Sequence, residues 1–315
     1  MTFIQFYPWW DCNNNCTFCF AKLLKQHKTT KEEKIKALDE ILSYLTNVEY
    51  IKDFEVVGLI GGEFFEDQLS DIDVYNKFLE VIQQCITLIK DKTIDKLYLM
   101  THLIVPDMTK LKEIIQKFND EGLINDLLIC TSFDAWGRFH TPERLQLWKD
   151  NVQILQQLNV KIHAEIILTQ YLIDKVFNHE IDLQYFIDNH IYLDFLNPQG
   201  LVLDGTMASE GKEAAIQQFG EKWLPTRASF LKFLTYLNNN HLYDIRKLFT
   251  LDKRAQELHM FYPKRKIQKR DIETYNEDLS TNDVLSCGHS EKFSFYSDSN
   301  KCMVCDIKNF IEDFC

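Results

Sequence analysis

Short apolar runs and amphipathic runs alternate along the first two hundred residues of the chain. The apolar runs predict six strands, at Thr2–Pro8, Phe54–Gly62, Lys96–Leu103, Leu127–Asp134, Val160–Leu168 and Ile191–Pro198. Regular alternation of strands with helices indicates an α/β fold, in which helical crossovers join parallel strands. Six such units are too few for a closed eight-unit barrel, which typically needs about 250 residues. A partial, TIM-like (β/α)6 barrel and a doubly wound sheet both fit this pattern.

The segments between these strands carry helix-start signals. Thr30 and Glu33 form a capping box before the first helix. Pro106 is expected to begin a later helix, and Pro142 another, with Thr141 before it as the N-cap. These signals indicate helical crossovers between the strands.

Two neighbouring strands place polar side chains on one face. This face consists of Cys130, Ser132 and Asp134 in one strand and Lys161, His163 and Glu165 in the next. Strands covered by helices on both sides are usually apolar on both faces. The pattern therefore predicts a barrel lumen lined for a polar ligand, although a set of satisfied buried hydrogen bonds would give the same pattern.

Charge and composition narrow the classes of function. The chain has 35 Lys and Arg against 47 Asp and Glu, a net charge of −12, and extended nucleic-acid binding is not expected because it needs clustered positive charge. No apolar run is long enough to span a bilayer, and the N-terminus lacks the basic start and cleavage site of a secretory signal. We therefore expect no membrane association and a cytoplasmic location, where nine cysteines would stay reduced and clustered ones would bind metal.

Cys12, Cys16 and Cys19 follow the first strand with the spacing Cys-x3-Cys-x2-Cys. The loop lies at the carboxyl end of that strand, where α/β sheets place their chemistry. Iron–sulfur clusters are usually held by four thiolates, so three local thiolates would leave one iron of a [4Fe–4S] cluster open to a ligand. A three-cysteine zinc loop and unrelated thiols are the alternatives.

Three stretches carry a resemblance to a known family. They are "CNNNCTFC", with Phe18 just before the last cysteine; "GGEFF" (Gly61 to Phe65) at the end of the second strand; and "SFD" (Ser132 to Asp134) on the fourth. Together they resemble the motifs of the radical SAM superfamily, over roughly Thr2 to Gly200. The resemblance implies a partial six-unit barrel.

The resemblance also implies a reaction. Cys12, Cys16 and Cys19 would ligate three irons of the cluster, and S-adenosylmethionine (AdoMet) would chelate the fourth. One electron, from a reductant such as a flavodoxin or ferredoxin, would cleave AdoMet to methionine and a 5′-deoxyadenosyl radical. That radical would abstract a hydrogen atom from the substrate.

Further residues receive roles through the resemblance. Gly61 and Gly62 would let the backbone approach the methionyl group, and Glu63 could pair with its ammonium. Phe18 would contact the adenine region. Ser132 and Asp134 would contact the ribose. From their positions on the strands, His163 and Glu165 are candidates to contact substrate or cofactor, and His102 is either a further candidate or a structural histidine. Cys85 is expected in the core, and Cys130 is expected to be a small buried hydrophobe rather than a lumen residue.

The alternation of strands and helices ends near Gly200. Residues 201–285 are expected to be a mainly helical linking region, and 286–315 a small cysteine-rich metal-binding module with a hairpin at Phe293–Lys301. Cys287, Cys302, Cys305 and Cys315 could hold a second iron–sulfur cluster. This arrangement of cysteines around a hairpin loosely resembles SPASM or Twitch modules. It departs from them in the hairpin, where Asn300 stands near the place of the usual glycine. Alternatively, Cys287, His289, Cys302 and Cys305 could form a zinc knuckle. The cluster is slightly favoured.

A radical SAM enzyme is the expected function. A peptide substrate is the first expectation, because auxiliary clusters often accompany peptide modification. The chain starts directly at the first strand, without a peptide-recognition domain of its own, which counts against a self-sufficient peptide maturase. A small-molecule or nucleoside-modifying radical SAM enzyme and a zinc-stabilised, non-catalytic binding protein are the alternatives.

Overall fold

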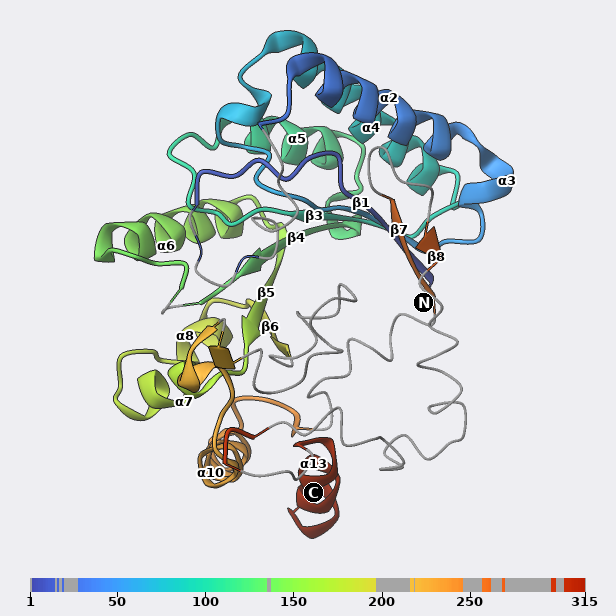
Figure 1. Cartoon of the computed structure of the whole chain (residues 1–315). Helices are drawn as coiled ribbons and strands as arrows, with labels where there is room; N and C mark the ends of the chain where they lie inside the picture. The colour runs from blue at the N-terminus through green and yellow to red at the C-terminus, as the bar shows by residue number, and fades with distance from the viewer. Residues whose placement is uncertain are drawn as a thin grey trace. The chain divides into compact units, whose positions relative to one another are not determined.

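A computed structural model describes residues 2–14, 16, 19, 28–134, 137–196, 216–217, 219–245, 257–261, 268–269, 296–298 and 303–314 of the chain (Figure 1). The chain divides into two compact units. One unit holds Met1–Ser132, Phe139–His163 and Lys253–Arg270, and the other holds Phe133–Arg138, Ala164–Asp252 and Asp271–Cys315.

The six predicted strands are confirmed, each shortened at one or both ends. They are β1 (Thr2–Phe6), β2 (Val56–Leu59), β3 (Lys96–Met100), β4 (Leu127–Ser132), β5 (Lys161–Ile167) and β6 (Tyr192–Leu196). The hydrogen-bonded order is β6-β5-β4-β3-β2-β1-β7-β8. Pairs β1–β2, β2–β3 and β3–β4 are parallel. Because β1 to β6 lie in sequence order, with no reversal, the fold is the partial barrel rather than the doubly wound sheet.

Two strands lie in a region expected to be mainly helical. These are β7 (Glu257–Phe261) and β8 (Gln268–Lys269), which sequence analysis did not predict. Strand β7 pairs in parallel with β1, and β8 pairs antiparallel with β7. Helix α10 (Arg227–Asn239) lies in the same region of the sequence, and the expectation of a mainly helical linking region stays a prediction.

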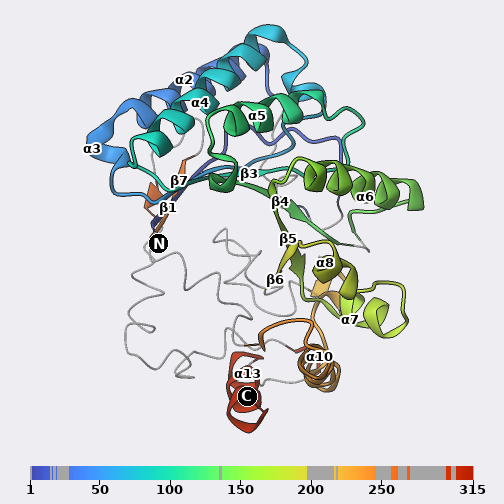
Figure 2. The ribbon, with the colours of Figure 1, turned by 180° about the vertical axis from the view of Figure 1, so that it is seen from behind.

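Helices occupy the connections between the six strands, as predicted. They are α2 (Lys31–Thr46), α3 (Val48–Ile51), α4 (Ile72–Lys90), α5 (Thr109–Asp120), α6 (Pro142–Gln157), α7 (Gln170–Phe177) and α8 (Gln184–Asp188), with the 3-10 turns η1 (Asp67–Leu69) and η2 (Ile124–Asp126). The 3-10 turn η4 (Glu221–Trp223) precedes α10, and helix α13 (Met303–Phe314) follows β8. Figure 1 and, from behind, Figure 2 show α2, α4 and α5 on the same side of β1, β3 and β4. Ile41 of α2, Phe78 of α4 and Leu99 of β3 are fully buried in this layer.

The helix starts follow the capping signals with one exception. The capping box of Thr30 and Glu33 is present, and Pro142 begins α6 after Thr141. Helix α5 begins at Thr109 rather than at Pro106, because the Asp107 carboxylate accepts a hydrogen bond from the Thr109 amide and forms a turn before the helix (2.8 Å).

The opposite face of β1 to β4 is mainly apolar and aromatic. Cys130 is fully buried there in a cluster with Tyr7, Val56, Ile60 and Tyr98. This face therefore differs from the polar lining that the side chains of the fourth strand predicted. Cys130 is a small, buried side chain in an apolar cluster, as expected.

Among the described residues, no helix is long and apolar enough to cross a membrane.

Candidate functional site

The cysteine segment leaves the carboxyl end of β1. Cys12 and Cys19 are partly exposed thiols, whereas Cys16 is 3% exposed. The Cys19 amide donates a hydrogen bond to the Cys16 carbonyl (3.4 Å). The segment therefore lies where parallel α/β sheets place their ligands.

Gly61 and Gly62 lie directly against the backbone of this segment. The Gly62 amide donates to the carbonyl of Trp9 (3.0 Å), and the Glu63 amide donates to the carbonyl of Asp11 (2.8 Å). A Cβ on Gly61 would lie 2.5 Å from the Trp9 oxygen, and one on Gly62 would lie 1.9 Å from the Asp11 oxygen. The two glycines are thus required for the backbone at Trp9 to Asp11 to pass this close to the end of β2. Their expected contact with a methionyl group stays a prediction.

Glu63 joins the end of β2 to the end of β3. Its side chain is fully buried, and it accepts hydrogen bonds from the Phe65 amide (3.0 Å), the Thr101 hydroxyl (2.9 Å) and the His102 amide (2.7 Å). These donors compensate the cost of burying a carboxylate. This carboxylate already accepts hydrogen bonds from three protein donors. Its expected pairing with an ammonium group stays a prediction.

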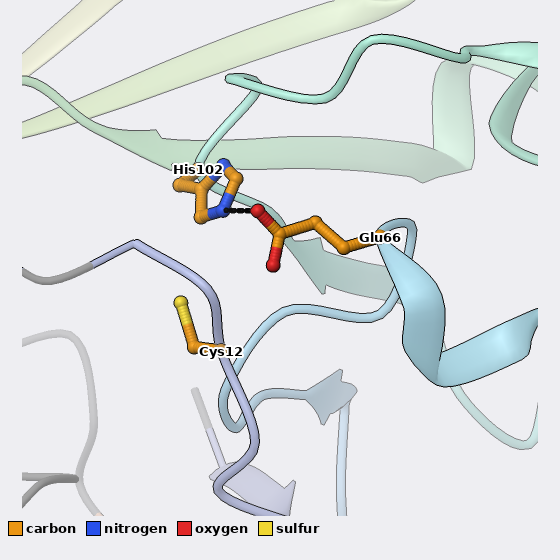
Figure 3. A group of neighbouring side chains, drawn as sticks. All are labelled: Cys12, Glu66 and His102. Carbon is orange, nitrogen blue, oxygen red and sulfur yellow. Dashed lines mark hydrogen bonds and ion pairs between the residues drawn. The ribbon is translucent and has the colours of Figure 1, made fainter.

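Cys12, Glu66 and His102 form a close group in the same unit (Figure 3). One ligand atom of each lies within 4.8 Å of the others. Burial, together with the carboxylates of Glu63 and Glu66, raises the pKa of the Cys12 thiol to about 12. Cys12 is therefore protonated at neutral pH in the metal-free chain, and a bound metal would displace that proton. Sequence reasoning named His102 but missed Glu66, although it lies three residues after Glu63.

Asn14 and Arg144 are two further residues that sequence reasoning missed. The Arg144 guanidinium, from the first turn of α6, donates to the side-chain oxygen of Asn14 between the first two cysteines (2.7 Å). Among the residues that the structure describes, Asn14 Nδ2 and Arg144 Nε are buried without a hydrogen-bond partner. Unpaired buried donors are costly. Two of them beside the cysteine segment suit an anionic group, which would pair them.

Ser132 and Asp134 are two positions apart along the chain but belong to different units. Ser132 is partly exposed at the end of β4. In the second unit, Asp134 is 2% exposed, and its Oδ1 accepts weakly from the Ile167 amide (3.4 Å). Burial raises the pKa of Asp134 to about 7 despite the nearby Arg138. Its Oδ2 has no hydrogen-bond partner within the described ranges, so it could accept a hydrogen bond from a hydroxyl group. The expected ribose contacts stay predictions.

The other histidine candidate and Glu165 occupy β5. His163 is buried, with its Nδ1 3.4 Å from the Cys130 thiol in the first unit. In the second unit, Glu165 is partly exposed, and its carbonyl accepts from the Phe133 amide (2.8 Å). Cys85 is fully buried in α4, as expected for a core residue.

Several predicted residues lie outside the described ranges. These are Phe18, Cys287, His289, Cys302, Cys315 and most of the predicted hairpin. Cys305 lies in helix α13, and its side chain is not among those described. Their expected roles stay predictions.

Comparison with known proteins gives structural likenesses only. No family model matches the chain, and no curated protein matches it. One similar solved structure is native anSMEcpe with bound AdoMet and Cp18Cys peptide, at 14% identity and a TM-score of 0.49, covering 76% of this chain and 59% of that one. Another is Streptococcus suis SuiB, at 14% identity and a TM-score of 0.46, covering 93% of this chain and 56% of that one. The chain thus spans less than two thirds of either structure.

Proposed function

We propose that the chain is a radical SAM enzyme, in which Cys12, Cys16 and Cys19 hold a [4Fe–4S] cluster with one open iron. The bound cluster would supply the reductive cleavage of AdoMet, with an electron from a flavodoxin- or ferredoxin-type reductant. The products would be methionine and a 5′-deoxyadenosyl radical that takes a hydrogen atom from the substrate. The proposal rests on the three-cysteine motif that resembles the family.

The observation that carries the proposal is the position of the backbone directly before Cys12. The carbonyls of Trp9 and Asp11 accept hydrogen bonds from the amides of Gly62 and Glu63 at the end of β2, at the carboxyl end of a parallel sheet. Clusters need thiolates in a defined arrangement, and a backbone held in place at the first cysteine lowers the entropic cost of binding.

Neighbouring residues supply what an anionic ligand needs. Asn14 Nδ2 and Arg144 Nε are buried donors without partners in the described part of the chain. Thiolates, sulfides and a carboxylate are all acceptors, so the three-cysteine cluster and the carboxylate of AdoMet both fit these donors. Arg144 would also offset part of the negative charge that three thiolates bring.

For the substrate, we propose a peptide. The support is the cysteine-rich C-terminal stretch, since auxiliary clusters of this kind often accompany peptide modification. The small-molecule alternative predicts product formation with metabolites and none with peptides.

Anaerobic reconstitution tests the proposed function. The full chain, given iron and sulfide without oxygen, should become brown and should release 5′-deoxyadenosine and methionine from AdoMet when dithionite is added. The variant with Cys12→Ala, Cys16→Ala and Cys19→Ala should release neither, while Cys85→Ala, which removes a buried thiol from α4, should retain the reaction. A colourless chain that binds only zinc would refute the proposal.

A further inference from the structure

Glu66 accepts hydrogen bonds at both carboxylate oxygens. Oε1 lies 3.1 Å from Nε2 of His102, and Oε2 accepts from the Asn13 amide (2.8 Å), the residue directly after Cys12. The side chains of Glu66 and His102 are 8% and 4% exposed. Both oxygens of this carboxylate therefore have partners within the protein.

The hydrogen bonds of His102 fix its orientation. The Ile104 amide donates to Nδ1 (2.9 Å), so this nitrogen carries a lone pair and the proton of the neutral ring is on Nε2. That proton is donated to Glu66. Glu63, the other carboxylate that faces this ring, lies 3.3 Å from Nδ1 and accepts from the His102 backbone amide, which holds the residue in place.

This arrangement argues against a mononuclear metal site. Cys12, Glu66 and His102 are close enough to share an ion. However, Nε2 can bind a metal only when it carries no proton. The proton of the ring would then be on Nδ1, where it would point at the Ile104 amide, which is itself a donor. The ring is therefore oriented toward the carboxylate and not toward a cation.

We propose that Glu66, held by His102, is a positioning residue for the first cluster ligand. It fixes the backbone directly after Cys12, and it places a negative charge within 4.8 Å of the Cys12 thiol. A nearby negative charge disfavours the addition of an electron to a cluster, so the carboxylate lowers its reduction potential. The effect on potential rests on the proposed function, whereas the effect on the backbone does not.

The backbone effect is measured in the cluster-free chain. In Glu66→Ala the Asn13 amide loses its acceptor and should exchange its hydrogen at least about fivefold faster, the factor that an average hydrogen bond is worth. The Asn13 side chain remains bonded to Asp67 (3.1 Å), so the segment keeps one tether. The matched control is Glu113→Gln on α5, where Glu113 accepts from Tyr75 (2.6 Å), and it should leave this amide unchanged. Unchanged exchange in Glu66→Ala would overturn the positioning role.

The charge effect is measured on the reconstituted cluster. Glu66→Gln should retain the same iron per chain with a more positive midpoint potential and an altered electron paramagnetic resonance signal, while Glu113→Gln matches the unmodified chain. An unchanged potential would overturn this part. If the unmodified chain binds zinc in place of iron and loses it in both Glu66→Gln and His102→Gln, the group is a metal site and the inference is wrong. A chain that holds no iron refutes the proposed function, and the exchange measurement still decides the backbone role.

Discussion

Gly62 has no room for any side chain. The hypothetical Cβ would lie 1.9 Å from the carbonyl oxygen of Asp11 and 2.5 Å from its carbon. Both atoms belong to backbone, which cannot rotate away as the end of a side chain can. A methyl group at this position must therefore displace the segment that carries Cys12.

The substitution Gly62→Ala should lower stability and metal binding together. We expect a loss of about 3 kcal/mol in the free energy of unfolding, at the upper end for overpacking, and a loss of most of the iron. The matched control is Gly122→Ala, where φ is +72° and nothing lies within 4 Å of the new Cβ. Strain alone should cost that variant about 1–2 kcal/mol and leave the iron unchanged. Urea unfolding and iron per chain measure both, and equal iron in the two variants would contradict the argument.

The sequence identified Gly61 and Gly62 by motif but not the contact that requires them. The contact joins residues about fifty positions apart, and local patterns carry no signal for it. The same holds for Arg144, which reaches Asn14 across 130 positions. Candidate site residues such as Cys12 and Glu63 can be proposed from sequence, whereas the groups that hold them depend on the packing of the folded chain.

At the scale of elements, periodicity predicted β1 to β6 because their buried apolar residues are local signals. Strand β7 was missed, since its place beside β1 depends on pairing between distant segments. The start of α5 was displaced from Pro106 to Thr109 because a side-chain turn at Asp107 precedes the helix. Such turns compete with helix formation at positions that a proline alone does not settle.

Helix α13 is joined to the start of α10 by one ion pair. Arg227 donates to both carboxylate oxygens of Asp306, at 2.7 and 2.8 Å, and the buried Tyr296 hydroxyl donates to the same carboxylate (2.8 Å). Asp306 is 5% exposed. A bidentate pair of this kind, with a buried carboxylate and a half-buried guanidinium, fixes both distance and direction between two helices.

Asp306→Asn should therefore loosen α13 from α10. We expect a loss of roughly 2 kcal/mol, the value of a hydrogen bond to a charged group, and faster protease cleavage within α13. The control is Glu180→Gln, which removes an exposed pair with Lys175 and should cost under about 1 kcal/mol. Equal losses in the two variants would show that the pair does not hold the helix.

At the scale of the whole molecule, the chain carries two groups of cysteines far apart in sequence. Whether the second group binds a metal, and which one, can be measured after the first group is removed. In the variant with Cys12→Ala, Cys16→Ala and Cys19→Ala, a cluster in the tail should leave about four irons per chain, whereas a zinc knuckle should leave one zinc and no iron. The ligand set of the cluster includes Cys315, whereas that of the zinc knuckle has His289 in its place. We expect Cys315→Ala to release the remaining iron and His289→Ala to retain it. Loss of metal in His289→Ala alone would contradict the cluster and identify the tail as a zinc site.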